Sequence, residues 1–561
     1  MHYVTVQDCL IVYCFMDTEK DEGYDITDIC IVGGGIGGLA AALALQTQCP
    51  YYKVRVYERD MLMNDRKQGY GLTLTNNKTG PLAQLGLLDE CVRCNSSCSS
   101  SCHYTFDQEG NVLGYFGRSI KSKFSETRDR RPEQQQGGNI GNLRIPRQYL
   151  RKMILQKLNP DSVVWGRKFC NFIEREDWVE VEFYANGVVE KLRTKVLVGA
   201  DGIKSAVRSA IDERRKQTSS LKYCGISVII GLTASRNPHP LVNNRGFYVV
   251  NGTHRLFTMP FEKRRAAVGC AASLFPRDQL SSLPTSSSES SSGLSSSPSI
   301  ESDESKAEGV EEYLTMWQLS FAGLSEEEAA LLKSSSGKAL LQRALAMTEG
   351  WFSAVRELLE NTLEGDIWAT GLFDRDPMPL KGRDQGSRVT CLGDACHPMS
   401  MFKGQGANQA LEDGPLLARW LSPDAPGAKR GRSVSSDEGG GDADADVDAE
   451  GRERRRGQRL LEGPAVRTRL RCFEREAVGR SASKVLASRE VALYLHSSQV
   501  LLDAKQQPSI EGVADARQIQ GKLGVSLWDV LKEAGVHADL GDKLDDALIR
   551  AVEPFLSINI N

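Results

Sequence analysis

The chain has 561 residues, of which 40% are hydrophobic and 25% are charged, and its formal net charge is −3. This composition is ordinary for a globular protein and gives no electrostatic reason to expect nucleic acid or an anionic membrane as a partner. The early apolar run at residues 9–16 is too short to span a bilayer and lacks a basic flank, so we expect neither membrane insertion nor a signal peptide. A cytoplasmic enzyme with mostly reduced cysteines is the default expectation, although an organelle would also fit.

The first predicted elements form a strand–turn–helix–strand unit that follows an extension at residues 1–25. "ITDICIV" predicts a buried strand, "GGGIGG" a turn, "LAAALALQ" a helix of small residues and "KVRVYE" a second strand. Gly33, Gly35 and Gly38 fill the pattern G-x-G-x-x-G, in which the glycines permit a tight turn, the approach of a pyrophosphate, and helix–strand packing. The helix start at Ile36 and Gly37 would then offer unpaired N–H groups to phosphates.

Glu58 ends the second strand, twenty residues after Gly38, where a carboxylate accepts hydrogen bonds from ribose hydroxyls. An acid at this place disfavours a 2′-phosphate, so the site suits FAD or NAD better than NADP. The neighbouring Arg59 either contacts the adenosine or is a solvated surface arginine.

Further along the chain, alternation around Asn186-Gly187 predicts a hairpin that returns to a buried strand at residues 196–198. Residues 221–366 then read as consecutive strands of a largely antiparallel sheet. Two low-complexity stretches, at residues 281–305 and 422–458, are too polar to form a packed core and are predicted to be disordered inserts.

Three separated motifs occur in a fixed order: the glycine turn, "GADGIKSAVR" at residues 199–208, and "GDACHPMSMFKGQGANQALED" at residues 393–413. Together they resemble the single-component, FAD-dependent aromatic-ring monooxygenases related to para-hydroxybenzoate hydroxylase, over residues 26–498 apart from the inserts. The resemblance implies an α/β fold in which a Rossmann-like FAD-binding domain is interleaved with a mostly antiparallel β-sheet substrate domain, followed by long C-terminal helices.

In domain terms, the resemblance divides the FAD-binding domain into two parts that flank the substrate domain. The expected boundaries are 26–220 and 367–421 for the FAD-binding domain, 221–366 for the substrate domain, 459–505 for a C-terminal helical region and 506–561 for a tail without an assigned role.

The resemblance also implies cofactor contacts residue by residue. Asp394 would bind the ribityl side of the flavin, and Gly404, Gln405 and Gly406 would pass close to the isoalloxazine. The helix that starts at Ala407 and Asn408 would aim its positive end at the ring. Three further contacts are expected from Arg147, for which Arg144 and Arg151 are alternatives, and from Asp201 and Gly202, which would otherwise form a simple β-turn.

The implied chemistry is carried by the flavin. NADPH or NADH would reduce FAD, O2 would give a flavin hydroperoxide, and one oxygen would pass to an aromatic or other small apolar substrate. No side chain is a certain catalytic group: Gln405 and Gly406 lie near the flavin, and His397 in such a loop is more typical of a structural residue. Met401 stands where the family has a second proline.

A substrate pocket is expected on the aromatic-rich strands. Its candidates are Phe247, Phe257 and Met259, although alternating strand positions place about half of such residues on the opposite face. The sequence does not determine the substrate, the choice between NADPH and NADH, or the oligomeric state.

Other interpretations of the sequence remain open at this point. An isoprenoid or lipid epoxidase or reductase would share the fold, and a non-catalytic FAD-binding regulatory protein would share the cofactor. The cluster Cys91, Cys94, Cys98, Cys102 and His103 could bind zinc, but it lacks a second separated cysteine pair, so we expect reduced surface cysteines and no metal.

Overall fold

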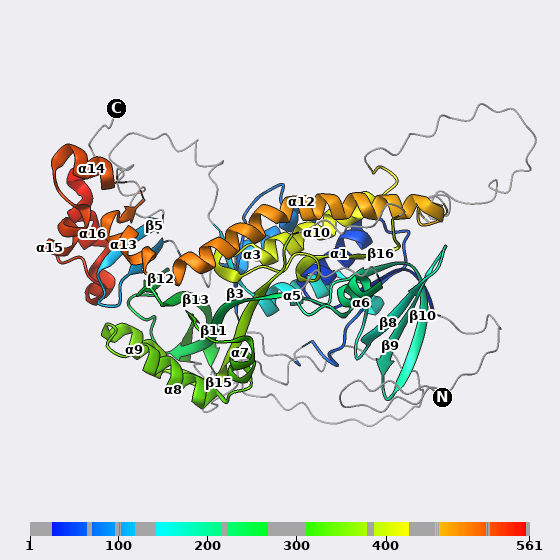
Figure 1. Cartoon of the computed structure of the whole chain (residues 1–561), viewed down its shortest axis with the longest axis horizontal. Coiled ribbons are helices and arrows are strands. Elements are labelled where there is room, and N and C mark those ends of the chain that lie inside the picture. Colours follow the sequence, from blue (N-terminus) through cyan, green and yellow to red (C-terminus); the bar gives the residue numbers. More distant parts are fainter. Residues whose placement is uncertain are drawn as a thin grey trace, which may run out of the picture.

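The computed structural model describes residues 25–63, 65, 70–95, 100, 102–117, 142–214, 221–266, 310–377, 386–425, 455, 457, 459–511, 513 and 516–556. The N-terminal extension, the insert at residues 281–305 and most of the insert at residues 422–458 lie outside these ranges. The described part is elongated, with one sheet and its helices at one end, a second sheet beside it, and a group of short C-terminal helices at the other end (Figure 1).

The first sheet has a parallel centre and an antiparallel edge. Its strands are β1 (Asp25–Val32), β2 (Val54–Tyr57), β7 (Val163–Val164), β8 (Lys168–Glu174), β9 (Val179–Ala185), β10 (Val188–Gly199) and β16 (Val389–Cys391). They follow the order β7–β2–β1–β10–β9–β8, and β16 pairs with the end of β10. Asn186 and Gly187 have φ values of 50° and 88°, which confirms the predicted hairpin turn.

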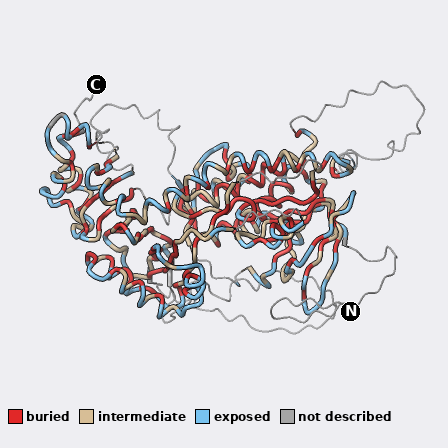
Figure 2. Tube along the Cα trace, in the orientation of Figure 1, coloured by how far each residue is buried: buried red, intermediate tan, exposed pale blue. Residues whose placement is uncertain are grey.

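Helices cover the first sheet and enclose a large apolar core. They are α1 (Ile36–Gln48), α5 (Arg147–Lys157), α6 (Ala206–Arg214), α10 (Gly406–Leu421) and α12 (Gly463–Leu495), with α2 (Pro81–Gln84) and α3 (Leu88–Asn95) at the edge. Helices α1 and α10 approach so closely that a Cβ atom on Gly414 would lie 2.7 Å from the Ala40 carbonyl oxygen. The small residues of α1 therefore have a packing role, and buried chain runs continuously through this region (Figure 2).

The second sheet is mostly antiparallel, as predicted. Its strands are β4 (Cys102–Phe106), β5 (Val112–Gly117), β11 (Lys222–Ser235), β12 (Arg245–Val250), β13 (His254–Ala266), β14 (Val310–Ala322), β15 (Thr362–Asp374) and β17 (Ser509–Ile510). The order is β15–β11–β14–β13–β12–β4–β5–β17, with parallel pairing only at β12–β4 and β5–β17 among the described strands.

The predicted domain boundaries do not follow the sheets. Strands β4 and β5 come from the segment assigned to the FAD-binding domain, and β17 comes from the tail. Tyr104 and Phe106 explain this placement, because both are fully buried in the core of the second sheet. Two short apolar strands thus join the sheet whose face they complete.

The C-terminal tail, which had no assigned role, helps to close that core. Helices α7 (Glu326–Lys333), α8 (Gly337–Met347) and α9 (Ser353–Glu360) cover part of the outer face, together with α13 (Gln499–Gln506), α14 (Ala516–Leu523), α15 (Leu527–Glu533) and α16 (Leu544–Leu556). Leu527, Leu531, Leu544 and Leu548 from the tail are each at most 1% exposed. The tail is therefore an integral part of the fold.

Two elements connect the sheets. A small antiparallel pair, β3 (Gly71–Leu74) with β6 (Leu143–Pro146), contacts β13. Helix α12 has 33 residues, about 50 Å of helix, and extends from α10 to the second sheet (Figure 1). There Arg489 forms a bidentate ion pair with Asp374 at 2.6 and 2.9 Å. Within the described residues, no helix is long and apolar enough to cross a membrane.

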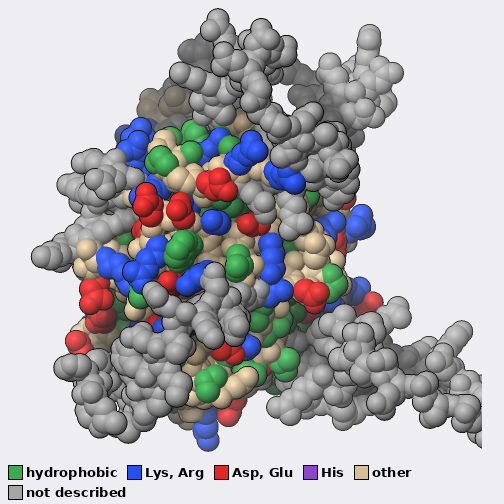
Figure 3. All heavy atoms as spheres, turned by 90° about the vertical axis from the view of Figure 1, so that its right-hand side faces the viewer, with side chains coloured by type: hydrophobic (Ala, Val, Ile, Leu, Met, Phe, Trp, Pro, Cys, Tyr) green, Lys and Arg blue, Asp and Glu red, His purple; other side chains and the backbone are tan. Residues whose placement is uncertain are grey.

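The charges on the end that carries β8, β9 and β10 are mixed. Basic and acidic side chains alternate over the described part of this face (Figure 3). Arg167 with Glu190, at 2.6 Å, and Lys191 with Glu182, at 3.3 Å, are examples of the pairs formed there. This face therefore matches the small net charge of the chain.

Candidate functional site

The glycine turn between β1 and α1 is closed on two sides and open on one. A Cβ on Gly33, whose φ is 108°, would lie 2.5 Å from the Ala200 carbonyl oxygen, and one on Gly38 would lie 2.0 Å from the Gly33 oxygen. Around Gly35, in contrast, the only described atom within 4 Å is an Arg147 guanidinium nitrogen, at 3.9 Å. Gly35 thus faces open space at the place where the motif predicts a pyrophosphate.

Glu58 supports this turn from behind. Its carboxylate accepts hydrogen bonds from the Gly34 N–H at 2.6 Å and the Asp60 N–H at 3.0 Å, and the residue is 7% exposed. A carboxylate has about four acceptor positions, so these two bonds leave room for a ribose hydroxyl. Arg59 is exposed beside it.

The structure separates the three candidate arginines. Arg147 lies within 5.8 Å of the Tyr70 ring and faces Gly35. Arg151 donates to the Gly34 carbonyl at 2.7 Å, so it holds the backbone of the turn. Arg144 points elsewhere, to Thr73 and His103. Arg147 is the one of the three that faces the open side of the glycine turn.

Asp201 acts mainly as a helix cap. Its carboxylate accepts hydrogen bonds from Ser205 Oγ at 2.5 Å and from the N–H groups of Ala206 and Val207 at 2.7 and 3.3 Å. Burial raises the pKa of Asp201, and these hydrogen bonds oppose the rise. Gly202 follows with a φ of 85°. The Asp-Gly motif therefore shapes the chain that lies directly under the glycine turn.

Asp394 stands beside the start of α10. Its Oδ1 atom lies 3.9 Å from the position of a Cβ on Gly406. The side chain is exposed, yet the surrounding protein raises its pKa, an effect opposed by His397 and Arg147. In the described chain no side chain caps α10 at Gln405. Its first N–H groups and the Asp394 carboxylate are thus available to a ligand on the same side.

Asn408 fixes the Gly404–Gly406 turn to the neighbouring strand. Its amide accepts from the Thr75 N–H at 2.9 Å and donates to the carbonyls of Thr73 and Gly404, each at 2.9 Å. Gly404 has a φ of 60°, and Ala407 is half-buried against the core. The Asn408 side chain therefore positions the turn.

A buried ionic network lies behind Asp394. The fully buried Asp413 carboxylate accepts from the Gly393 N–H at 2.7 Å, bonds His397 Nε2 at 2.8 Å and pairs with Arg480. Burial by itself would lower the pKa of His397, but the charge and hydrogen bond of Asp413 raise it above the ordinary value. His397 is 2% exposed, so its geometry fits a residue that holds the loop in place.

One face of the second sheet is directed at this loop. Phe257 and Met259 pack there with Phe402 and Met401, which belong to the short 3-10 turn η4 (Met401–Lys403). Phe247 does not join them: it pairs with Thr258 in the ladder and lies in the core on the opposite face, 0% exposed. The alternation of a strand separates Phe247 from the other two candidates.

The same face carries an arginine that the sequence reasoning missed. Arg255 precedes Phe257 and Met259 at the two-residue spacing of one strand face, and this spacing in "RLFTM" is the signal that could have revealed it. Its guanidinium carbon lies 4.7 Å from the centre of the Tyr248 ring and 5.1 Å from that of Phe402. A buried arginine among rings thus adjoins the Gly404–Gly406 turn.

The cysteine cluster does not assemble a metal site in the residues described. Cys91 and Cys102 are buried, and His103 directs Nε2 at Arg144, 3.2 Å away. Among these residues no group of three potential ligands could hold an ion, and Cys98 lies outside them. His103 is instead part of the arginine cluster.

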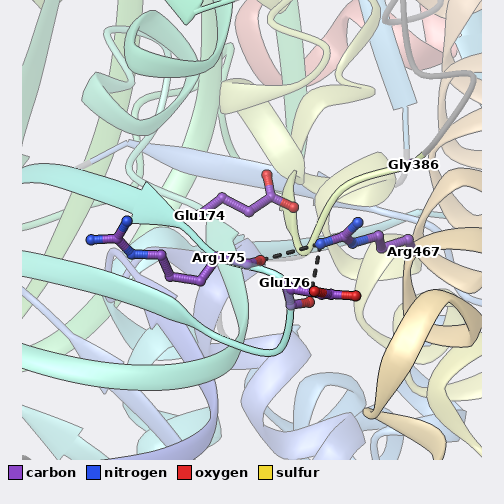
Figure 4. Close-up of a pocket in the computed structure, with 5 residues that line it drawn as sticks. All are labelled: Glu174, Arg175, Glu176, Gly386 and Arg467. Atoms are coloured by element: carbon purple, nitrogen blue, oxygen red, sulfur yellow. Dashed lines mark hydrogen bonds between the residues drawn. The ribbon is translucent and has the colours of Figure 1, made fainter.

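A surface pocket at the other end is unrelated to the motifs. Its lining comes from the turn between β8 and β9, from Gly386 and from α12, where Arg467 donates to the carbonyls of Arg175 and Glu176 at 3.2 and 3.0 Å (Figure 4). These residues belong to none of the three motifs, so we do not place the site there.

The donor set of the motif site fits FAD. Gly35 leaves space for a pyrophosphate, Arg147 supplies a cation beside it, and Asp394 offers an accessible carboxylate to ribityl hydroxyls. The uncapped start of α10 supplies N–H groups for a flat ring that carries negative charge when reduced.

Comparisons with known proteins agree with this geometry. The family model described as "FAD binding domain" matches residues 26–278. The aurachin C monooxygenase/isomerase of Stigmatella aurantiaca is 26% identical over 71% of this chain and 81% of its own length. The 6-hydroxynicotinate 3-monooxygenase of Pseudomonas fluorescens is 25% identical over 70% and 82%. The crystal structure of Klebsiella pneumoniae HpxO complexed with FAD and uric acid has a TM-score of 0.54 at 17% identity, with 94% of this chain and 97% of that chain covered, and so shares the fold.

Proposed function

Because the chain belongs to the FAD-dependent flavoprotein monooxygenase family, whose members include aromatic hydroxylases, we propose that it uses NADPH or NADH and O2 to hydroxylate an aromatic or other small apolar substrate. The observation that carries the proposal is the position of the aromatic sheet face, which packs against the loop of the Gly-Asp motif. A substrate on that face would lie beside the flavin ring.

The overall reaction balances as substrate–H + NAD(P)H + H⁺ + O2 → substrate–OH + NAD(P)⁺ + H2O. Bound FAD supplies the redox chemistry, by accepting hydride and activating oxygen. The chain itself would bind the pyrophosphate at Gly35 and Arg147, hold the ribityl chain at Asp394, and stabilise negative charge on the ring with the start of α10. Phe257, Met259 and their neighbours would exclude water from the reacting atoms.

The test begins with the FAD-loaded protein under anaerobic conditions. NADPH and NADH are added separately while the flavin absorbance is followed, and the rate is measured again with phenols and other aromatic compounds. We expect bleaching that an aromatic substrate accelerates, followed on admission of 18O2 by a product 18 mass units heavier in place of the 16 expected for ordinary oxygen.

Two other results would point away from hydroxylation. A bound flavin that neither nicotinamide cofactor reduces, with or without aromatic compounds, would favour a protein that retains FAD without turnover. Reduction followed only by hydrogen peroxide release, with every compound tried, would contradict the proposed oxygen transfer.

A further inference from the structure

Two buried arginines lie on the sheet face beside the proposed flavin site. Arg144 and Arg255, here called the arginine pair, are 9% and 5% exposed. They come from different sheets, β6 and β13, and Tyr248 lies between them: its hydroxyl interacts with both cations and accepts a hydrogen bond from Arg255. Tertiary packing thus concentrates two positive charges at one place.

The charges of the arginine pair are not balanced by acids. Within the described ranges, neither guanidinium has a carboxylate partner, and the Nε–H of each is buried without an acceptor. Burial lowers the pKa of both arginines as a result. A buried cation without a counter-charge costs stability, and a site that carries two such cations has room for an anionic ligand.

Both members of the pair touch the turn that we place at the flavin ring. Arg144 donates to the Thr73 hydroxyl, and Thr73 is the nearest described neighbour of Gly404, with its Cβ 3.5 Å from the position of a Gly404 Cβ. Arg255 lies against Phe402, on the chain that leads into the same turn. The arginine pair therefore adjoins the proposed reaction centre from the side of the substrate sheet.

Aromatic rings surround the same spot. Tyr248 and Phe257 stack with ring centres 4.9 Å apart, and His103 lies parallel to Phe116 at 5.0 Å. Burial and the nearby Arg144 lower the pKa of His103 to about 3, so its ring is neutral and adds no third cation. The surroundings suit a flat ligand whose ring packs on rings and whose acidic group meets the guanidinium groups.

We propose that the arginine pair binds the carboxylate of an aromatic acid, so that the substrate class of this monooxygenase is an aromatic or heteroaromatic carboxylate. A carboxylate is the group that best matches the planar fork of a guanidinium. The inference deepens the proposed function and rests on it, because the ligand is taken to be the molecule that is hydroxylated.

The test measures binding to the oxidised, FAD-loaded protein and needs no turnover. Benzoic, 4-hydroxybenzoic, salicylic, anthranilic and quinoline-2-carboxylic acids are each titrated beside the corresponding neutral amide, with the flavin spectrum and calorimetry as readouts. At least one acid should bind ten-fold or more tightly than its amide. Arg255→Met and Arg144→Met should each remove most of that preference while they leave the affinity for the amide nearly unchanged.

A matched control and a stability measurement guard against misfolding. Arg356→Met changes an exposed arginine of α9 that pairs with Glu360, and it should keep the full acid preference. Without ligand, Arg255→Met should melt at or above the temperature of the wild type, because it removes an uncompensated buried charge. The acid that binds best should raise the melting temperature of the wild type more than that of the variant.

Three outcomes would overturn the inference. They are the absence of binding by every acid, equal affinities for each acid and its amide, and an acid preference that survives in both variants. If either variant loses FAD and retains the preference, the arginine pair serves the flavin instead. An acid preference in a protein whose flavin no nicotinamide cofactor reduces would leave the binding site standing and reject the monooxygenase function alone.

Discussion

Replacement of Asp413 by asparagine should destabilise the protein more than any other single isosteric change in the Gly-Asp motif. The buried carboxylate receives a backbone N–H, His397 Nε2 and the Arg480 guanidinium, and two of these contacts are charge-assisted. Each such contact contributes about 1.5–3 kcal/mol, and loss of one member of a buried ionic network costs about 3–5 kcal/mol. For a chain of this size that loss corresponds to a decrease in melting temperature of about 6–10 °C.

The measurement is the thermal and urea unfolding of wild type and Asp413→Asn, together with the fraction of FAD retained after gel filtration. Glu412→Gln is the matched control, because Glu412 also faces Arg480, at 3.1 Å, but is partly exposed. It should change the free energy of unfolding by less than about 0.5 kcal/mol. Equal losses in the two variants, or an Asp413→Asn protein as stable as the wild type, would refute the argument from burial.

The effect of this substitution should also depend on pH. Asp413 raises the pKa of His397, so the stabilisation by protonated His397 is fully present below its ordinary pKa of about 6.5 and is lost as the pH rises through the raised value. The difference in free energy of unfolding between wild type and Asp413→Asn should therefore be larger at pH 6 than at pH 9. A difference that is constant over this range would show that His397 does not carry the coupling.

Three further predictions concern the glycine turn, the tail and the departure from the family pattern. Gly35→Ala should fold but bind FAD at least ten-fold more weakly, whereas Gly38→Ala should fail to fold, because its methyl group would lie 2.0 Å from a carbonyl oxygen of the turn; circular dichroism and FAD titration separate the two. Leu548→Ala should cost about 2–5 kcal/mol in urea unfolding, and Leu502→Ala, at a 53% exposed position, less than about 0.5 kcal/mol. Met401→Pro should change stability by no more than about 1 kcal/mol, because the residue opens a turn after an extended Ser400 with ψ of 154°. Loss of the folded state in that variant, followed by circular dichroism, would contradict this expectation.

Local sequence determined the parts of this protein that depend on short stretches of chain. The glycine turn, the hairpin at Asn186-Gly187 and the start of α10 each require a particular backbone conformation or a missing side chain, and a few neighbouring residues encode these requirements. The order of three such motifs was sufficient to predict the FAD-binding fold, because each one is a recurring solution to the binding of a dinucleotide.

Tertiary structure alone decided which of several equivalent residues face the site. Arg144, Arg147 and Arg151 lie within eight positions of one another in the sequence, yet one faces the sheet, one the open side of the turn and one its backbone. Phe247 and Phe257 look alike in composition, but ladder register directs them to opposite faces.

The placement of the tail and of Arg255 likewise could not follow from local pattern. Leu527, Leu544 and Leu548 gain their role from contact with strands more than one hundred residues earlier in the chain. Arg255 becomes notable only because β6 brings Arg144 near the same tyrosine. Side chains distant in sequence come together through burial of apolar surface, which is non-directional, so the identity of the neighbours is a property of the whole fold.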